Sequence, residues 1–266
     1  AGQLLQMPST RGTEVDTKLL TLTPDNPERG LPVIQGVYVL FGAPGTPGQA
    51  PRAVLDGVEL TGLRTSAVSA LGVRLLADAS PRHLVVVGTG VQAWEHALTF
   101  QDVFGLERVS VVGRDADRAA ALAARIEAEL GVTASAAGPE AVAEADVVVT
   151  CTAATAPLFD GTLVPEHATV VAMGSHTTDA RETDDALARR ATVAVESRDS
   201  AAREAGDVTL AIDSGALAGI EDTVTLAELV AGTARRREGA PALFVTTGMP
   251  WQDLVVASAV AREVLG

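Results

Sequence analysis

The segment VVVGTGVQA, residues 85–93, joins an apolar run to small residues at a spacing that suits phosphate binding. Gly88 permits a tight turn, Gly90 lets the backbone approach a pyrophosphate, and Ala93 permits close packing of a helix on a strand. A helix that begins here would point free backbone N–H groups at an anion. Glycine-rich turns that bind nothing also carry this pattern, so the flanking elements decide its meaning.

Lys18 is the only lysine in the chain, and all the other basic residues apart from histidine are arginines. An ammonium can lose its proton at an accessible pH, whereas a guanidinium cannot. A lone lysine in an arginine background therefore indicates a position where arginine does not suffice. The alternative is a surface lysine that remains by chance.

The flanking elements form two patterns along the chain. Residues 1–57 contain strand-like runs and turn signals at 23–30 and 43–51, which predicts an antiparallel sheet. Residues 59–77 are expected to form a helix with Thr61 as its N-cap. From residue 82 to about 200, short apolar strands alternate with alanine-rich helices. This alternation predicts a parallel sheet covered on both faces, with the glycine turn at its first strand-to-helix junction.

Composition excludes several other classes of protein. The net charge of −14 argues against nucleic acid or an anionic membrane as the main partner. No apolar stretch reaches membrane-spanning length and no signal peptide is visible, so cytoplasm is expected. Cys151 is the single cysteine and fits a reducing compartment. No metal site is expected, because His83, His96 and His167 lack partners at ligand spacing.

The end of the second strand in this region bears on the choice of cofactor. It reads VVGRDADR, where Gly113 and Arg114 occupy the positions at which an NAD-binding site carries an acidic residue, and Arg118 follows one turn later. A guanidinium favours the 2′-phosphate of NADP, so NADP(H) is preferred and NAD(H) stays possible. Asp115 is either a ribose acceptor or the N-cap of the next helix.

Several motifs together resemble the ornithine cyclodeaminase/mu-crystallin family over nearly the whole chain. They are TPDNPERGLPVIQGVYVLF, AVLDGVELTGLRTSAVSALGVRLLA, VVVGTGVQA, MGSHTTDARETDD and VTTGMPWQDL. The resemblance implies an α/β homodimer with a Rossmann-type nucleotide-binding domain over 81–244. It also implies a smaller α+β substrate and dimerisation domain over 1–80, to which 245–266 return. Family members usually carry a leading segment of about fifty residues with a further carboxylate-binding arginine, which this sequence does not include.

The resemblance also implies site residues. Lys18 matches the family's active-site lysine, and Arg64 matches the arginine that holds the substrate carboxylate. Arg64 is also expected in the first turn of its helix, beside free backbone N–H groups. His176 stands where ornithine cyclodeaminases carry an aspartate, and it either donates a proton or only hydrogen-bonds within its loop. The candidate cofactor-binding residues are Gly88, Thr89, Gly90, Val91, Gln92, Ala93, Arg114, Cys151, Thr152, Thr247 and Gly248.

The segment GSHTTDARETDD, residues 174–185, contains His176 and is similar to the corresponding segment of mu-crystallin-like reductases. These enzymes deliver a hydride to an imine that already exists. The sequence therefore predicts an NADPH-dependent reductase of a cyclic ketimine carboxylate, Δ1-pyrroline-2-carboxylate or Δ1-piperideine-2-carboxylate. Three alternatives stay open: ornithine cyclodeaminase, alanine dehydrogenase, and a non-catalytic nucleotide- or ligand-binding protein.

Overall fold

The computed structural model describes residues 2–23, 25–42, 48 and 50–265. Most of the expected turn at 43–51, and Pro24 of the turn at 23–30, lie outside these residues. The chain forms two compact units, unit 1 from residues 1–65 and 248–266 and unit 2 from residues 66–247. The first boundary between these units lies within the continuous helix α1 (Gly57–Leu76), after residue 65, whereas the sequence predicts a domain boundary after residue 80. No described helix combines the length and the apolar character that crossing a membrane requires.

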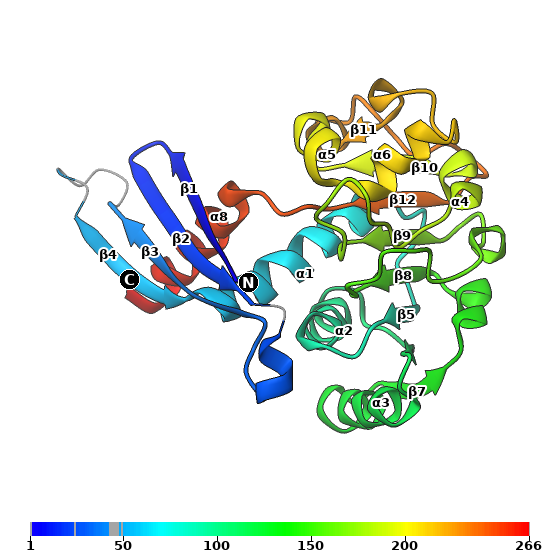
Figure 1. The fold of residues 1–266 in the computed structure, drawn as a ribbon, viewed down its shortest axis with the longest axis horizontal. Coiled ribbons are helices and arrows are strands. Elements are labelled where there is room, and N and C mark those ends of the chain that lie inside the picture. The colour runs from blue at the N-terminus through cyan, green and yellow to red at the C-terminus, as the bar shows by residue number, and fades with distance from the viewer. Residues whose placement is uncertain (1, 24, 43–47, 49, 266) are drawn as a thin grey trace. The chain divides into compact units, whose positions relative to one another are not determined.

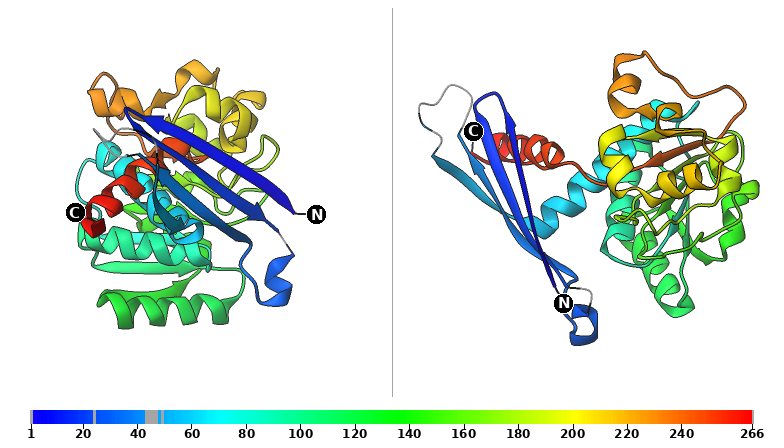
Figure 2. Two further views of the ribbon diagram at one scale, coloured as in Figure 1. Left: turned by 90° about the vertical axis from the view of Figure 1, so that its left-hand side faces the viewer. Right: turned by 45° about the horizontal axis from the view of Figure 1, so that its top comes forward.

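Unit 1 contains the antiparallel sheet that the sequence predicts, with its four strands in chain order. They are β1 (Gln3–Arg11), β2 (Glu14–Leu22), β3 (Ile34–Phe41) and β4 (Pro51–Asp56), with the short 3-10 turn η1 (Asn26–Arg29) between β2 and β3. Helix α8 (Pro250–Leu265) packs along one face of this sheet, as Figure 2 (right) shows. Tyr38 and Leu40 of β3 form a core there with Leu254 and Ala257 of α8. The two ends of the chain thus build one unit.

Strand β2 reverses the usual distribution of polar and apolar side chains. Glu14, Asp16 and Lys18 alternate along the strand and are buried, on the face that carries the core. The intervening residues of the strand point to the opposite face. Leu19, which follows Lys18, also lies on that face and is exposed. Since successive side chains of a strand point to opposite faces, the helix-covered face of this sheet receives its charged groups.

Unit 2 is built around a sheet of eight parallel strands in the order β11-β10-β12-β9-β8-β5-β6-β7 (Figure 1). They are β5 (His83–Val87), β6 (Arg108–Val112), β7 (Thr133–Ala137), β8 (Val147–Thr150), β9 (Thr169–Ala172), β10 (Thr192–Val195), β11 (Val224–Thr225) and β12 (Ala242–Val245). Alternate residues of β5 contribute to two separate cores, Leu84 and Val86 to one and Val85 and Val87 to the other. Helices therefore cover both faces, and the predicted α/β Rossmann-type class is confirmed.

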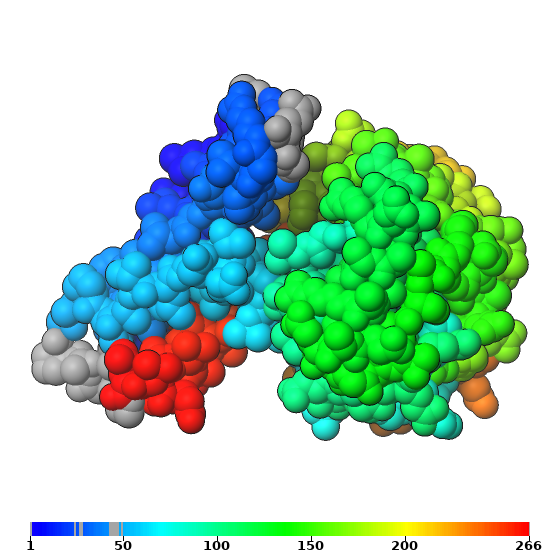
Figure 3. Space-filling view, turned by 90° about the horizontal axis from the view of Figure 1, so that it is seen from below, coloured from blue at the N-terminus to red at the C-terminus, as the bar shows by residue number. Residues whose placement is uncertain are grey.

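The helices of unit 2 divide between these two cores. One core takes residues from α1, α2, α3 and α7, and the other takes residues from α4, α5 and α6. Their bounds are α2 (Val91–Phe104), α3 (Ala116–Leu130), α4 (Asp185–Arg190), α5 (Arg198–Glu204), α6 (Gly206–Asp213) and α7 (Leu226–Ala231), with 3-10 turns η2 (Pro139–Glu144), η3 (Gly161–Leu163) and η4 (Ile220–Asp222). Figure 3 shows one face of unit 2, and the segment from α2 to β8 (green) forms most of that face.

The start of α1 differs from the sequence prediction. The helix begins at Gly57, and the carboxylate of Asp56 accepts hydrogen bonds from the backbone N–H groups of Val58 and Glu59. Thr61 is therefore not the N-cap, because Asp56 already accepts from the first free donors of the helix. Arg64 in turn lies beyond the first turn, so the free N–H groups expected beside it are not there.

Candidate active site

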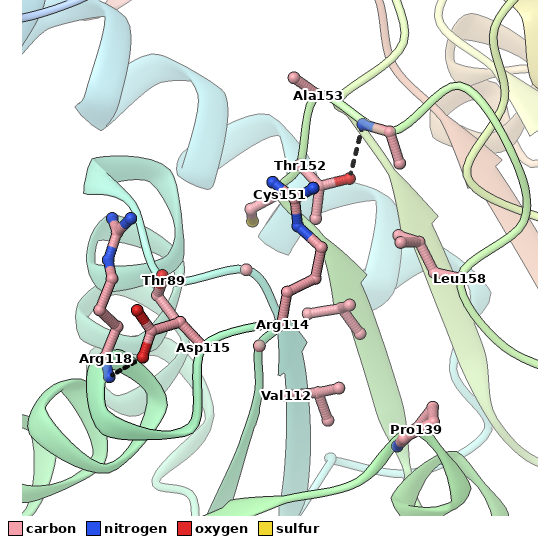
Figure 4. A pocket seen from close by; sticks show the side chains of 14 residues that line it. Thr89, Val112, Arg114, Asp115, Arg118, Pro139, Cys151, Thr152, Ala153 and Leu158 are labelled. Carbon is pink, nitrogen blue, oxygen red and sulfur yellow. Dashed lines mark hydrogen bonds between the residues drawn. The ribbon is translucent and has the colours of Figure 1, made fainter. Parts of the chain in front are cut away.

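A cavity of about 790 Å³ opens where parallel strands of unit 2 end (Figure 4). The last residues of β5 and β6, Val87 and Val112, line it together with Cys151, which directly follows β8. From β5 the chain proceeds to β6 and β7 on one side, whereas β8 and β9 lie on the other. The cavity thus occupies the topological switch point, where open parallel sheets bind their ligands.

The glycine turn has the geometry that its sequence predicts. Gly88 adopts a φ of +130°, and a Cβ atom there would lie only 2.6 Å from the carbonyl oxygen of Cys151. Gly90 is the N-cap of α2, and apart from its chain neighbours no atom of the described residues lies within 4 Å of where its Cβ would be. Ala93 is completely buried against the sheet. The start of α2 therefore offers open space and free N–H groups, which fits a pyrophosphate.

The segment that joins β6 to α3 and the first turn of α3 contribute two arginines to the lining of the same cavity. Figure 4 shows the side chains of Arg114 and Arg118 on either side of Asp115. Asp115 Oδ1 accepts hydrogen bonds from the backbone N–H groups of Asp117 and Arg118, at 3.0 and 3.1 Å. Asp115 is thus the N-cap of α3, which was one of its two predicted roles. A Cβ atom at Gly113 would lie 2.8 Å from the Cγ2 methyl group of Thr89, so a larger residue at the strand end would require Thr89 to shift.

The buried carboxylate of Glu182 joins two loops at this edge of the sheet. Its Oε1 accepts from the backbone N–H and the hydroxyl of Thr152, at 3.0 and 2.5 Å. Its Oε2 accepts from the Thr150 hydroxyl at 2.6 Å and from the Gly174 N–H at 2.7 Å. Burial raises the pKa of Glu182, and these hydrogen bonds oppose that change. Glu182 lies within the motif MGSHTTDARETDD, where no local sequence signal predicts this role.

Unit 1 brings Lys18 and Arg64 together around a third residue, Asp253 of α8. Lys18 Nζ lies 2.8 Å from Oδ1 and 2.7 Å from Oδ2 of Asp253, and Arg64 Nε lies 3.4 Å from Oδ1. Lys18 also donates to Thr61 Oγ1 at 3.2 Å. Gln252 accepts from Arg64 Nη1 at 3.2 Å. The sequence predicted the two cations and missed the carboxylate that joins them.

Burial changes the acid–base behaviour of this cluster. Burial and the neighbouring charge of Arg64 lower the pKa of Lys18 to about 8, against the opposing effects of Asp253 and Asp16. Asp16 accepts a hydrogen bond of 2.6 Å from Tyr38, and burial raises the pKa of Asp16 to about 6. Burial also raises the pKa of the Tyr38 hydroxyl. The amine therefore titrates within the range where enzymes operate, as proton transfer requires.

The other predicted site residues fall into three places. Cys151 and Thr152 line the cavity, and burial raises the pKa of the Cys151 thiol. The N–H of Thr247 donates to Glu196 at 2.8 Å, and neither Thr247 nor Gly248 lines the cavity. Gly248 belongs to unit 1, where a side chain would overlap the guanidinium of Arg64.

His176 is exposed in the loop after β9 and does not line the cavity. Val91 and Gln92 open α2, next to Gly90, and do not line the cavity either. Within the described chain, no three His, Cys, Asp or Glu side chains gather in a way that could hold a metal ion.

The fold and the cavity define a dinucleotide-binding enzyme of the Rossmann type. The sequence profile of the ornithine cyclodeaminase/mu-crystallin family matches residues 1–266, and the chain belongs to this family. It is 36% identical over 265 residues to Delta(1)-pyrroline-2-carboxylate reductase 2 of Burkholderia ambifaria, a match that covers 99% of this chain and 81% of that protein.

Solved structures agree with this assignment. The fold is similar to that of Delta(1)-pyrroline-2-carboxylate reductase from Thermococcus litoralis in complex with NADH and L-proline, with a TM-score of 0.91, 26% identity, and coverage of 99% of this chain and 83% of that one. It is also similar to an archaeal alanine dehydrogenase dimer with bound NAD, with a TM-score of 0.87, 26% identity, and coverage of 99% and 82%. The predicted family and fold are both confirmed.

The four hydrogen bonds that Glu182 accepts predict that a neutral side chain at this position lowers the free energy of unfolding. In Glu182→Gln, one oxygen becomes an NH₂ donor, and two donors face each oxygen in the native structure. Either orientation of the amide leaves donors opposed, so urea denaturation should show a free energy of unfolding lower by about 1–3 kcal/mol. Glu129→Gln, which alters an exposed pair with Arg125, is the control and should change it by less than about 0.5 kcal/mol. Equal stabilities of the two variants would contradict a stabilising role for the hydrogen bonds of Glu182.

Proposed function

We propose that this protein reduces a cyclic ketimine carboxylate, such as Δ1-pyrroline-2-carboxylate or Δ1-piperideine-2-carboxylate, to the cyclic amino acid. The observation that carries the proposal is the buried cluster of Lys18, Arg64 and Asp253 in unit 1. A cyclic imino acid offers one carboxylate and one basic nitrogen, and the cluster offers one guanidinium and one titrating amine. The 36% identity to a Delta(1)-pyrroline-2-carboxylate reductase supports the same substrate class.

Each cation has one part in the reaction. Arg64 binds the substrate carboxylate, because its planar guanidinium can donate two parallel hydrogen bonds. Lys18 gives a proton to the imine nitrogen as that nitrogen becomes an amine. The turn from Gly88 to Ala93 would hold the cofactor, which when bound would supply the hydride for the imine carbon. One hydride and one proton together convert the C=N bond to a CH–NH unit.

Ornithine cyclodeaminase is the second candidate, and residue 176 argues against it. Cyclodeamination must handle an amino group in several steps, for which the family's cyclodeaminases carry an aspartate. This chain carries His176 there, on an exposed loop. A reductase needs no carboxylate at this position, since its imine is already formed.

The test of the function follows NADPH oxidation with each of the two cyclic imines. The unmodified protein should turn over at least one of them. Lys18→Arg and Lys18→Met should each lower kcat/KM by about a hundredfold or more, because neither side chain delivers a proton near neutral pH. The affinity for NADPH should be unchanged, because the glycine turn belongs to unit 2 whereas Lys18 belongs to unit 1. Normal turnover by Lys18→Arg would overturn the proton-donor role, and formation of proline and ammonia from L-ornithine would favour cyclodeamination instead.

We also propose that NADPH is preferred over NADH. Arg114 follows β6 and Arg118 lies in the first turn of α3, and neither has an ion-pair partner among the described residues. The competing ribose acceptor, Asp115, already accepts two backbone hydrogen bonds as the N-cap of α3. A 2′-phosphate would complete the guanidinium contacts, whereas a ribose hydroxyl would not.

Titration with both reduced cofactors tests this preference. NADPH should bind more tightly, and Arg114→Ala should weaken NADPH binding by about 1–3 kcal/mol while NADH binding changes little. Arg203→Ala serves as the control, because Arg203 is exposed and its one ion pair among the described residues is with its neighbour Glu204. Equal affinities of the unmodified protein for the two cofactors would exclude the proposal.

We further propose a homodimer that forms through the uncovered face of the unit 1 sheet. This face carries apolar side chains from three strands, with Leu19 37%, Val37 37% and Val54 68% exposed. In unit 1, no described helix packs on it. Contiguous exposed apolar surface of this kind marks interaction sites. The dimeric state of the similar archaeal alanine dehydrogenase supports a second copy as the occupant.

Light scattering coupled to gel filtration tests the dimer. The unmodified protein should elute with twice the chain mass, and Val54→Glu should shift it toward the monomer, since a buried unpaired carboxylate opposes association. The matched control is Val230→Glu, which replaces a valine of unit 2 that is 62% exposed. A dimer that survives Val54→Glu as well as Val230→Glu would place the interface elsewhere.

A further inference from the structure

Two side chains from distant parts of the sequence hold the amine of Lys18. Both oxygens of Asp253 on α8 lie within 2.8 Å of Nζ, and Thr61 Oγ1 on α1 lies 3.2 Å away. All three side chains are buried, and Lys18 has no exposed surface. Since solvent is excluded, these two partners determine how the amine is oriented.

Thr61 can only accept a hydrogen bond from this amine. It donates its own proton to the carbonyl oxygen of Gly57 at 2.6 Å, which leaves its lone pairs to face Nζ. One N–H of Lys18 therefore points at Thr61 and another at Asp253. An ammonium carries three N–H groups, so one is left without a partner in the part of the chain that the structure describes.

We propose that Asp253 and Thr61 are positioning residues, which orient the Lys18 ammonium so that its third N–H group is presented to the nitrogen of the substrate. This inference rests on the ketimine reduction proposed above, and neither residue touches the reacting atoms. In the step itself, an N–H bond of Lys18 breaks as the new N–H bond of the substrate forms. The hydride that the C=N carbon requires would come from the bound reduced cofactor. Lys18 is left as a neutral amine beside Asp253 and must regain a proton before the next turnover.

Asp253 has a second contact that links orientation to substrate binding. Its Oδ1 atom lies 3.4 Å from Arg64 Nε, and its neighbour Gln252 accepts from Arg64 Nη1. One turn of α8 therefore fixes both the proposed proton donor and the proposed carboxylate anchor. The distance between these two groups is thereby set by the backbone of a helix.

The charged groups around Lys18 come from three elements, and they determine its titration. Arg64 on α1 lowers its pKa, whereas Asp253 on α8 and Asp16 on β2 raise it, and burial gives the net decrease to about 8. Asp253 differs from Asp16 in one respect: its Oδ1 accepts a hydrogen bond from Lys18 Nζ, whereas the side-chain hydrogen bond of Asp16 comes from Tyr38. Replacing each carboxylate in turn separates direct contact from charge at a distance.

The single lysine makes a direct measurement possible. Protein labelled with ¹³C- and ¹⁵N-lysine gives one side-chain amine signal, whose shift with pH reports the pKa of Lys18. Asp253→Asn should lower that pKa by about 1–3 units, as expected on removal of an adjacent opposite charge. Asp16→Asn, the matched control, should lower it by less. An unchanged titration in Asp253→Asn would overturn the proposal.

Thr61→Val tests orientation without any change of charge. The lysine titration should stay close to that of the unmodified protein, while kcat for imine reduction falls by about tenfold to a hundredfold because the ammonium is free to rotate. Cofactor affinity should be unchanged, and Thr61→Ser, which keeps the acceptor, should restore kcat. Normal turnover by Thr61→Val would overturn the orienting role. If Asp253→Asn does not fold, the kcat of Thr61→Val alone tests the positioning proposal.

The lysine titration also separates this inference from the proposed function. A protein that reduces neither cyclic imine, yet shows the expected Asp253→Asn shift, would refute the function and leave Asp253 as the group that holds the amine. A protein that reduces imines normally with Asp253→Asn in place would refute the positioning role alone.

Discussion

Two cations converge on one buried carboxylate, and the rest of unit 1 is arranged around that contact. Lys18 and Arg64 lie on a strand and a helix from the first part of the chain, and Asp253 lies on the last helix. Two buried positive charges without a counter-ion would cost several kcal/mol each, so the packing of α8 on the sheet and the protonation of Lys18 depend on each other. The core formed by Tyr38 and Leu254 excludes water from the cluster, which strengthens both ion pairs.

Much of unit 2 follows from local sequence signals. The strand before Gly88, the helix after Gly90 and the cap at Asp115 each depend on neighbours a few residues away, and the structure has all three. The strand order does not follow in this way, because β12, the last strand along the chain, inserts between β9 and β10. Glu182 was missed for the same reason, since the donor hydroxyls of Thr150 and Thr152 are about thirty residues away in the sequence.

The site in unit 1 shows the limit of sequence reasoning more sharply. Lys18 could be singled out because it is the only lysine in the sequence. Asp253 could not, because it is one of many aspartates and no local pattern distinguishes it. Thr61 was assigned a capping role, whereas Asp56 caps the helix and frees Thr61 to receive a hydrogen bond from Lys18. One sequence feature does indicate the site. Glu14, Asp16 and Lys18 occupy every second position of β2, and the next residue in this series, Leu20, belongs to the core, so the charged side chains share its buried face.

The assembly of unit 1 from both chain ends has a consequence for biosynthesis. Lys18 and Asp253 are separated by 235 residues, so at roughly 5–20 residues per second the ribosome makes the counter-ion about 12–50 s after the amine. During that interval β2 carries its charged face without α8, whereas the strands and helices of unit 2 emerge in sequence order. The nascent chain is therefore expected to complete its nucleotide-binding unit first and to close the lysine site as its final folding event.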